Sequence, residues 1–195
     1  MSAIVTIFGS SRVAPESEEY RLALQMGRLL ASAGFTVCNG GFGGTMEAAA
    51  HGACEAGGHT IGVTVGVFGG KANKWIKEEI TCTGLVERLT KLIELGDAYI
   101  VLRGGTGTLL ELAAAWEFVN KGMESKAHHC RRFILGSRHR DPEGRAYLGR
   151  IGRLYCSCHP GCRSPRVCGP AEKEVRSLAV CLVHRVVQHC KHGIC

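Results

Sequence analysis

The stretch Arg103-Gly104-Gly105-Thr106-Gly107-Thr108-Leu109-Leu110-Glu111 lies between an apolar run, residues 98–102, and an Ala- and Leu-rich run that ends near residue 119. A short apolar run, a glycine turn and then an apolar pattern of helical period predict a buried parallel strand followed by a helix. A second stretch, Asn39-Gly40-Gly41-Phe42-Gly43-Gly44-Thr45-Met46-Glu47, has the same order 64 positions earlier. In both, Gly-Gly-x-Gly precedes a threonine, and a glutamate stands seven residues after the first glycine. Both stretches join a predicted strand to a predicted helix.

The same alternation of strands and helices continues on both sides of these stretches. Glycine turns separate short β-branched runs from segments of helical period, and residues 66–83 are expected to form a loop with one helical turn. The pattern predicts a Rossmann-like, doubly wound parallel sheet in three α/β/α layers, with ligands bound at the carboxyl ends of the strands. The predicted strands are 4–8, 35–38, 59–65, 98–102 and 132–136, and the predicted helices are 15–33, 46–55, 85–95 and 109–119.

The glycine turns suit an anion. Glycine lets a ligand approach the backbone, and the free N–H groups at a helix start bind phosphate. The alternative is that these glycines only make tight turns between strand and helix. No Gly-Lys-Ser/Thr follows, as a Walker A loop requires, and the Gly-x-Gly-x-x-Gly spacing after the first strand is absent, so a mononucleotide fits better than a dinucleotide. The candidate phosphate- or substrate-binding residues are Gly104, Gly105, Thr106, Gly107 and Thr108, then Gly40, Gly41 and Gly43, and Gly9, Ser10 and Ser11 after the first strand.

Three charged side chains are candidates for chemistry. Glu47 and Glu111 fall in the first turn of their predicted helices, where a carboxylate beside a phosphate site would face a glycosidic carbon. The alternative for each is a structural role at the positive end of the helix dipole. Arg88 lies in the predicted helix 85–95, and its spacing alone favours an ordinary exposed position.

The stretch 104–111 resembles the PGGxGTxxE motif of the Lonely Guy (LOG) family, many of whose members are cytokinin riboside 5′-monophosphate phosphoribohydrolases. The resemblance covers about residues 3–126. It includes the Gly-Ser-Ser turn at 9–11, the helix pattern Tyr20-x-x-Ala23-x-x-x-Gly27-x-x-Leu30-Ala31, the turn at 40–47 and Asp97-Ala98-Tyr99.

The resemblance implies hydrolysis of the N-glycosidic bond of a nucleoside 5′-monophosphate, of cytokinin or AMP type, to free base and ribose 5-phosphate. Glu111 falls on the family's catalytic glutamate and Arg88 on its catalytic arginine. The reaction needs no metal and no redox cofactor, and family members are homodimers or larger assemblies. A non-catalytic nucleotide-binding or sensor protein of the same superfamily is the alternative.

The sequence departs from the family pattern at three positions. Arg103 replaces the proline that opens the motif, Leu110 replaces the first of two glutamates, and Leu89 stands where plant-type enzymes have lysine after the arginine. These departures leave the base specificity open.

Charge and cysteine divide the chain of 195 residues into unequal parts. Residues 1–129 hold 11 Lys and Arg against 13 Asp and Glu, a net charge of −2, with three cysteines. Residues 130–195 hold 13 against 4, a net charge of +9, with eight cysteines. We therefore expect a nucleotide-binding domain over 1–136 and an atypical basic Cys/His/Arg-rich tail over 137–195.

Three hypotheses address the tail. Cys156, Cys158, His159 and Cys162 have the residue types of a zinc site but not the usual spacing. The charge suits nucleic acid, yet few aromatics and no known module are present, which disfavours such a partner. The third hypothesis is a frameshift soon after residue 126.

No apolar run reaches the roughly 18 residues of a membrane span, and the N-terminus lacks the pattern of a secretory signal, so a cytoplasmic location is expected.

Overall fold

The computed structural model describes residues 2–66, 71–121, 132–135 and 155–156. The described strands form one sheet in the order β4-β3-β2-β1-β5-β6-β7, in which β1 to β6 run parallel and β7 runs antiparallel to β6. The strands are β1 (Ile4–Phe8), β2 (Thr36–Asn39), β3 (Thr60–Val65), β4 (Glu78–Cys82), β5 (Ala98–Val101), β6 (Arg132–Leu135) and β7 (Tyr155–Cys156). The helices are α1 (Glu18–Ser32), α2 (Thr45–Glu55), α3 (Leu85–Leu95) and α4 (Thr106–Lys121).

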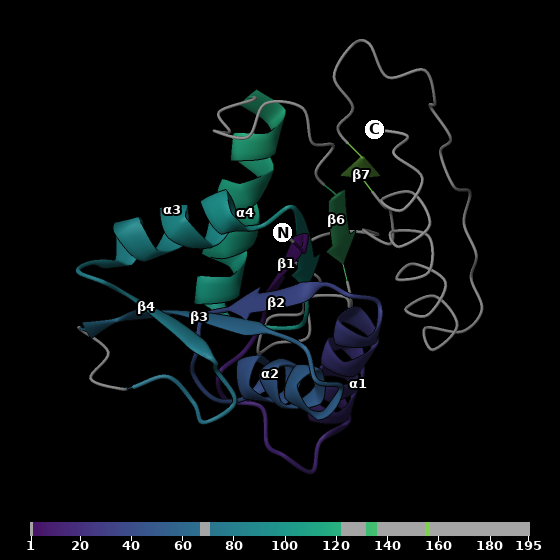
Figure 1. The fold of residues 1–195 in the computed structure, drawn as a ribbon. Coiled ribbons are helices and arrows are strands. Elements are labelled where there is room, and N and C mark those ends of the chain that lie inside the picture. Colours follow the sequence, from purple (N-terminus) through teal and green to yellow (C-terminus); the bar gives the residue numbers. More distant parts are fainter. Residues whose placement is uncertain (1, 67–70, 122–131, 136–154, 157–195) are drawn as a thin grey trace.

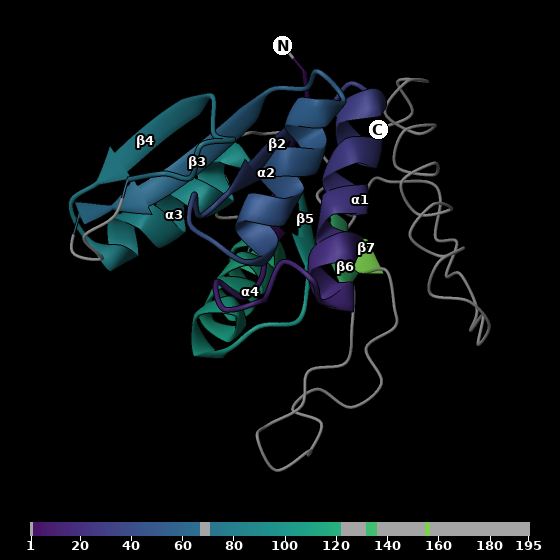
Figure 2. The same ribbon diagram turned by 90° about the horizontal axis from the view of Figure 1, so that it is seen from below.

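Helices cover both faces of the sheet. Figure 1 shows α1 and α2 on one face and α3 and α4 on the other, and the view from below in Figure 2 places α1 and α2 in front of the strands. The chain moves outward from β1 to β4 and then returns to the other side of β1 with β5. The predicted Rossmann-like, three-layer α/β/α fold is confirmed, and the strand order changes direction between β1 and β5, where such folds bind ligands.

Helix α1 ends within one residue of its predicted end, but it begins at Glu18, three residues after the predicted start. The Ser17 side chain accepts a hydrogen bond from the Tyr20 backbone N–H at the N-cap, and Gly34 follows the helix with a φ of +88°. Two glycines let α1 and α2 approach closely. A Cβ on Gly27 would lie 1.9 Å from the Ala49 carbonyl oxygen, and one on Gly52 would lie 1.9 Å from that of Leu24.

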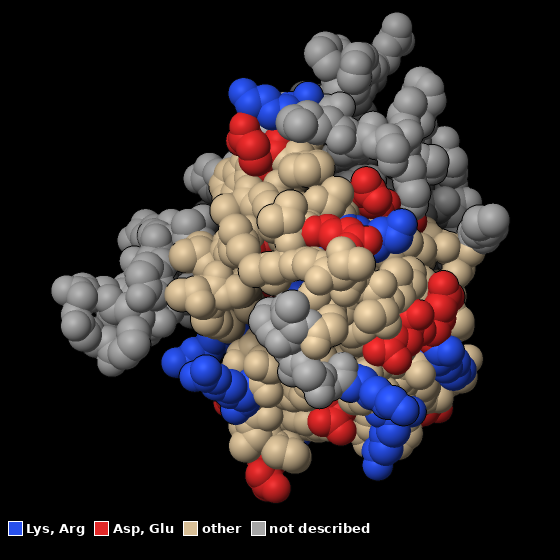
Figure 3. Space-filling model, turned by 90° about the vertical axis from the view of Figure 1, so that its left-hand side faces the viewer, with Lys and Arg blue, Asp and Glu red and all other residues tan. Residues whose placement is uncertain are grey.

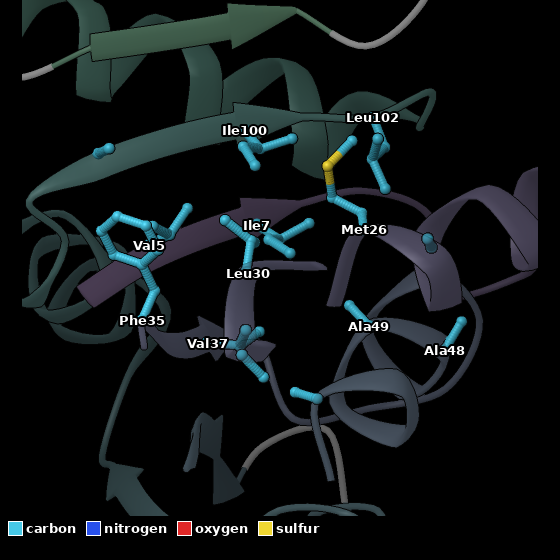
Figure 4. Close-up of a cluster of buried hydrophobic side chains, with 14 residues drawn as sticks. Val5, Ile7, Met26, Leu30, Phe35, Val37, Ala48, Ala49, Ile100 and Leu102 are labelled. Carbon is cyan, nitrogen blue, oxygen red and sulfur yellow. The ribbon is translucent and has the colours of Figure 1, made fainter. Parts of the chain in front are cut away.

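Apolar residues fill the space on both sides of the sheet. Figure 4 shows the cluster beneath α1 and α2, in which Val5 and Ile7 of β1 meet Met26 and Leu30 of α1. A second buried cluster packs α3 and α4 against the opposite face and includes Phe8, Tyr99, Leu92, Ile93 and Leu112. The two cores hold the strand ends, and therefore the turns that follow them, in fixed positions.

Two sequence predictions were wrong. Residues 66–83 were expected to lack a strand, but β4 pairs with β3 over Glu78–Cys82. This strand lies at the edge of the sheet and carries exposed glutamates, so it shows no apolar run. Helix α4 begins at Thr106 rather than at residue 109, because the Leu109 N–H already bonds to the Gly105 carbonyl. Glu111 therefore lies in the second turn of α4, whereas Glu47 lies in the first turn of α2 as predicted.

Strand β6 confirms the predicted strand near residues 132–136, and β7 adds a strand from within the expected tail. Of the candidate zinc ligands, Cys156 lies in β7, whereas Cys158, His159 and Cys162 lie outside the described ranges, and the nucleic-acid and frameshift hypotheses stay predictions. On the face that Figure 3 presents, acidic and basic side chains lie interspersed, in keeping with the small net charge of residues 1–129. Within the described ranges, no helix combines the length and apolar character needed to cross a membrane.

Candidate functional site

Three turns meet at the carboxyl ends of β1, β2 and β5. The Ser10 N–H donates to the Arg103 carbonyl over 3.2 Å and thereby joins the turn after β1 to the turn after β5. The Ser10 carbonyl accepts a hydrogen bond from the Thr45 N–H at 2.9 Å, at the start of α2. The predicted binding segments, far apart in the sequence, are thus adjacent in the fold.

Arg88 of α3 points into this junction and is only 6% exposed. Its Nε donates to the Val63 carbonyl over 2.8 Å, its Nη2 to the Gly40 carbonyl over 3.4 Å, and its Nη1 to Glu111 Oε1 over 3.4 Å. A Cβ on Gly40 would lie 1.9 Å from Nη2, so the guanidinium rests directly on the glycine backbone. This burial excludes the interpretation of Arg88 as an ordinary exposed helix residue.

Glu111 of α4 is the charged partner of Arg88 at this junction. Burial raises the pKa of its carboxyl group to about 7, even though the charge of Arg88 and its hydrogen bond act to lower it. A carboxyl group with this pKa changes charge near neutral pH, which is typical of residues that take part in chemistry. The two predicted catalytic residues, Arg88 and Glu111, are thus in contact through their 3.4 Å hydrogen bond.

The start of α4 lies five residues before Glu111 and is open at two glycines. Among the described residues, a Cβ on Gly105 or on Gly107 would meet no atom within 4 Å apart from its chain neighbours and the backbone of its own helix. Gly104, by contrast, packs on the buried Thr108, whose Oγ1 would lie 2.0 Å from such a Cβ. The N–H groups of the first helical turn have no acceptor within the helix, so this end can bind an anion.

The turn after β2 differs from the turn after β5, although their sequences are alike. Gly41 and Gly44 have φ angles of +77° and +65°, which favour glycine. The Ser10 carbonyl lies over Gly44, at 2.3 Å from where a Cβ would stand, and covers the start of α2. Asn39 braces this turn from within, since its Oδ1 accepts from the Gly41 N–H and its Nδ2 donates to the Met46 carbonyl.

The remaining predicted residues lie around this turn. Gly9 packs on Thr45, Ser10 Oγ accepts a hydrogen bond from the Arg12 N–H, and the Ser11 carbonyl lies 3.5 Å from the Cβ position of Gly43. Glu47 is half-buried beside Gly43, and its charge raises the pKa of Tyr20, after the larger effect of burial. Ligand binding by these residues and by Gly40, Gly41 and Gly43 stays a prediction.

Sequence reasoning missed two residues at this site. The Phe42 ring lies 5.7 Å from the Arg88 guanidinium carbon, and Asn73 hydrogen-bonds the carbonyls of Gly41 and Phe42. Asn73 stands in a stretch with no periodic pattern, so only the fold reveals its contact with the turn. Among the described residues, no three His, Cys, Asp or Glu side chains cluster as a metal site requires.

Residues 2–123 match the model of the SLOG cluster4 family. The chain belongs to this family. An uncharacterized protein of Archaeoglobus fulgidus is 35% identical over 51% of this chain and 66% of its own length. A cytokinin riboside 5′-monophosphate phosphoribohydrolase of Mycobacterium tuberculosis is 36% identical over 60% of this chain and 67% of its own length. The chain thus spans about two thirds of these relatives, and the resemblance to the LOG family is confirmed.

A solved structure shares the fold. The molybdenum cofactor binding protein of the phototrophic bacterium Rippkaea orientalis is 25% identical, covers 72% of this chain and 78% of its own, and superimposes with a TM-score of 0.58. The proteins that resemble this SLOG family member therefore include both one named as an enzyme and one named as a ligand-binding protein.

Proposed function

We propose that the protein hydrolyses the N-glycosidic bond of a nucleoside 5′-monophosphate and releases the free base and ribose 5-phosphate. The observation that carries this proposal is the buried contact between Arg88 and Glu111 beside the open start of α4. The 36% identical relative named as a phosphoribohydrolase supports it.

The phosphate occupies the start of α4 in this proposal. The backbone N–H groups of Thr106, Gly107 and Thr108 face the anion, and the open space at Gly105 and Gly107 admits it. Anchoring the phosphate places the sugar near Glu111, which stands one helical turn beyond Thr108 and therefore on the same side of α4.

Glu111 acts as a carboxylate. Departure of the base leaves positive charge on the anomeric carbon and ring oxygen, and a nearby carboxylate stabilises that charge and orients the attacking water. Water adds to C1′ as the C1′–N bond breaks, and the proton that the water loses is matched by the proton that the leaving base gains. Arg88 holds Glu111 in place and binds the ribose or the departing base. No metal or redox cofactor enters this reaction.

Binding without hydrolysis is the second candidate. It is favoured by the three hydrogen bonds that already occupy Arg88 and by the likeness to a molybdenum cofactor binding protein. Incubation with AMP and with isopentenyladenosine monophosphate separates the two functions. Release of ribose 5-phosphate supports the hydrolase, whereas binding of these nucleotides with no release supports the binding protein.

We also propose that the protein is a cytoplasmic homodimer. Exposed apolar side chains gather at the starts of α3 and α4, next to the Arg88–Glu111 contact; they are Leu85, Val86, Leu109 and Leu110, with Val86 77% exposed. Among the described residues, Cys38, Cys54 and Cys82 are free thiols, which suits a reducing compartment. Sedimentation equilibrium at micromolar concentration tests the dimer, and a monomer would contradict it.

A further inference from the structure

The segment of residues 72–77, which we call the strap, crosses from the sheet edge to the turn after β2. Its side chains and backbone are fixed at several points. The Trp75 carbonyl accepts hydrogen bonds from Thr60 Oγ1 at 2.7 Å and from Cys54 Sγ at 3.0 Å. Glu79 of β4 accepts a hydrogen bond from the Ala72 N–H at 3.1 Å. The strap is thus anchored to α2, β3 and β4.

Packing adds to these hydrogen bonds. Ile76 lies over Gly62 of β3 so closely that a Cβ on Gly62 would be 2.9 Å from its Cγ2. A side chain at position 62 would displace Ile76, so the glycine in the middle of this strand is explained by the strap above it.

Asn73 connects the strap to the turn after β2. Its Nδ2 donates to the Phe42 carbonyl over 2.8 Å and to the Gly41 carbonyl over 3.0 Å, while its backbone N–H donates to the Gly41 carbonyl over 2.7 Å. Its Oδ1 accepts from the Trp75 N–H over 3.0 Å, which fixes the orientation of the amide. Three of these four hydrogen bonds join Asn73 to the turn, and the fourth orients its side-chain amide within the strap.

The same turn is what Arg88 rests on. The Gly40 carbonyl accepts a hydrogen bond from Nη2 of Arg88, and the Phe42 ring faces the guanidinium. We propose that Asn73 is a positioning residue, which holds the turn of residues 40–44 against Arg88 and thereby fixes Arg88 against Glu111. This inference rests on the proposed function for its catalytic consequence but not for its geometry.

Two substitutions isolate the side-chain contact. Asn73→Ala removes every side-chain hydrogen bond, and Asn73→Asp keeps the acceptor for Trp75 but loses both donors to the turn. Lys77→Ala is the matched control. Lys77 lies at the other end of the strap, and its Nζ donates a hydrogen bond to the Gly58 carbonyl, away from the turn after β2. Thermal unfolding establishes that all three variants fold.

NMR can follow the titration of the Glu111 carboxyl carbon, and the signal is assigned by its absence in Glu111→Gln. Because the pKa of Glu111 depends on how close Arg88 lies, this titration reports a displacement of Arg88 and does not require catalysis. Arg88 lowers the pKa of Glu111, so release of Arg88 should raise the midpoint by about half a unit or more in both Asn73 variants and leave it unchanged in Lys77→Ala. An unchanged or lowered midpoint in Asn73→Ala would overturn the proposal, whether or not the protein is a hydrolase.

Kinetics supply the second measurement where the wild type releases ribose 5-phosphate. A misplaced catalytic group lowers kcat more than it weakens binding, so kcat should fall about tenfold in Asn73→Asp with KM changed by less than about threefold. A raised KM with unchanged kcat would contradict a positioning role. Wild-type inactivity would count against the proposed function alone, since the NMR titration still decides the role of Asn73.

Discussion

Arg88 and Glu111 stand on different helices, 23 positions apart, and share a hydrogen bond of 3.4 Å at the carboxyl edge of the sheet. Their side chains are only 8% and 13% exposed, so water screens this contact poorly. A buried pair of this kind contributes little net stability, because desolvation of both groups offsets their attraction. Its placement beside an open helix start is better explained by chemistry on a bound ligand than by stability of the fold.

Arg88→Lys tests whether the forked shape of arginine is required. Lysine carries the charge, but its three N–H groups share one nitrogen and cannot replace Nε, Nη1 and Nη2, which reach Glu111 and the Val63 and Gly40 carbonyls from separate positions. We expect a loss of unfolding free energy of about 1–3 kcal/mol, because buried carbonyls lose their donors, and a fall in hydrolysis of about 100-fold. Arg28→Lys, which alters an exposed ion pair with Glu55, should change stability by less than about 0.5 kcal/mol. Equal losses in the two variants in urea unfolding would contradict this account.

The raised pKa of Glu111 makes stability depend on pH in a defined direction. The unfolded chain binds this proton only below about 4.5, whereas the native protein holds it up to about 7. The proton therefore stabilises the native protein at low pH, and this stabilisation is lost as pH rises through 7. The loss in the free energy of unfolding is about 3 kcal/mol. The wild type should therefore lose stability relative to Glu111→Gln between pH 4 and pH 8, as measured by urea unfolding.

Glu87 supplies a control of opposite sign. Hydrogen bonds from the Thr83 hydroxyl and backbone N–H lower its pKa, so its contribution is present above about 4.5 and is lost as pH falls below that value. The wild type should gain stability relative to Glu87→Gln as pH rises through the acid range. A gap between wild type and Glu111→Gln that does not change with pH would show that Glu111 is an ordinary carboxylate.

The dependence of kcat/KM on pH tests the charge state of Glu111 that acts. The proposed role requires the carboxylate, so kcat/KM should rise with pH and level off above an apparent pKa near 7. The phosphate of the substrate also titrates, near pH 6. Its contribution to the pH profile is obtained from the pH dependence of ribose 5-phosphate binding to Glu111→Gln, which lacks the Glu111 carboxyl group. An optimum below pH 6 would mean that protonated Glu111 acts as an acid instead.

The glycines at the start of α4 separate ligand binding from folding. Within the described part of the chain, an alanine methyl group at position 107 meets no atom beyond its own helix within 4 Å, and it improves helix propensity by about 1 kcal/mol, so Gly107→Ala should raise the melting temperature. The same methyl group would occupy the proposed phosphate site and weaken nucleotide binding by about tenfold or more. Gly104→Ala is the contrasting variant, because its methyl group collides with Thr108 and should lower the melting temperature. Unchanged nucleotide binding in Gly107→Ala would contradict the placement of the phosphate at the start of α4.

The sequence was sufficient for the parts of the fold in which local pattern and burial agree. Strand β1 follows from an apolar run and helix α1 from a pattern of helical period, and the resemblance to a family motif indicated Glu111 and Arg88, which the structure places in contact. Strand β4 was missed because an edge strand with exposed Glu78 and Glu79 carries no apolar signal. The two similar glycine turns could not be distinguished from sequence, since the Ser10 carbonyl that covers one of them comes from a distant turn. Asn73 was missed for the same reason, because its partners, Gly41 and Phe42, lie more than 30 residues away.

The most direct test of the central claim compares the wild type with Glu111→Gln, using AMP and isopentenyladenosine monophosphate, with ribose 5-phosphate release and nucleotide binding measured on the same samples. The account predicts that the wild type releases ribose 5-phosphate, and that Glu111→Gln binds the same nucleotide with release reduced by about 100-fold or more. Equal release by the two proteins, or nucleotide binding by the wild type with no release, would contradict it.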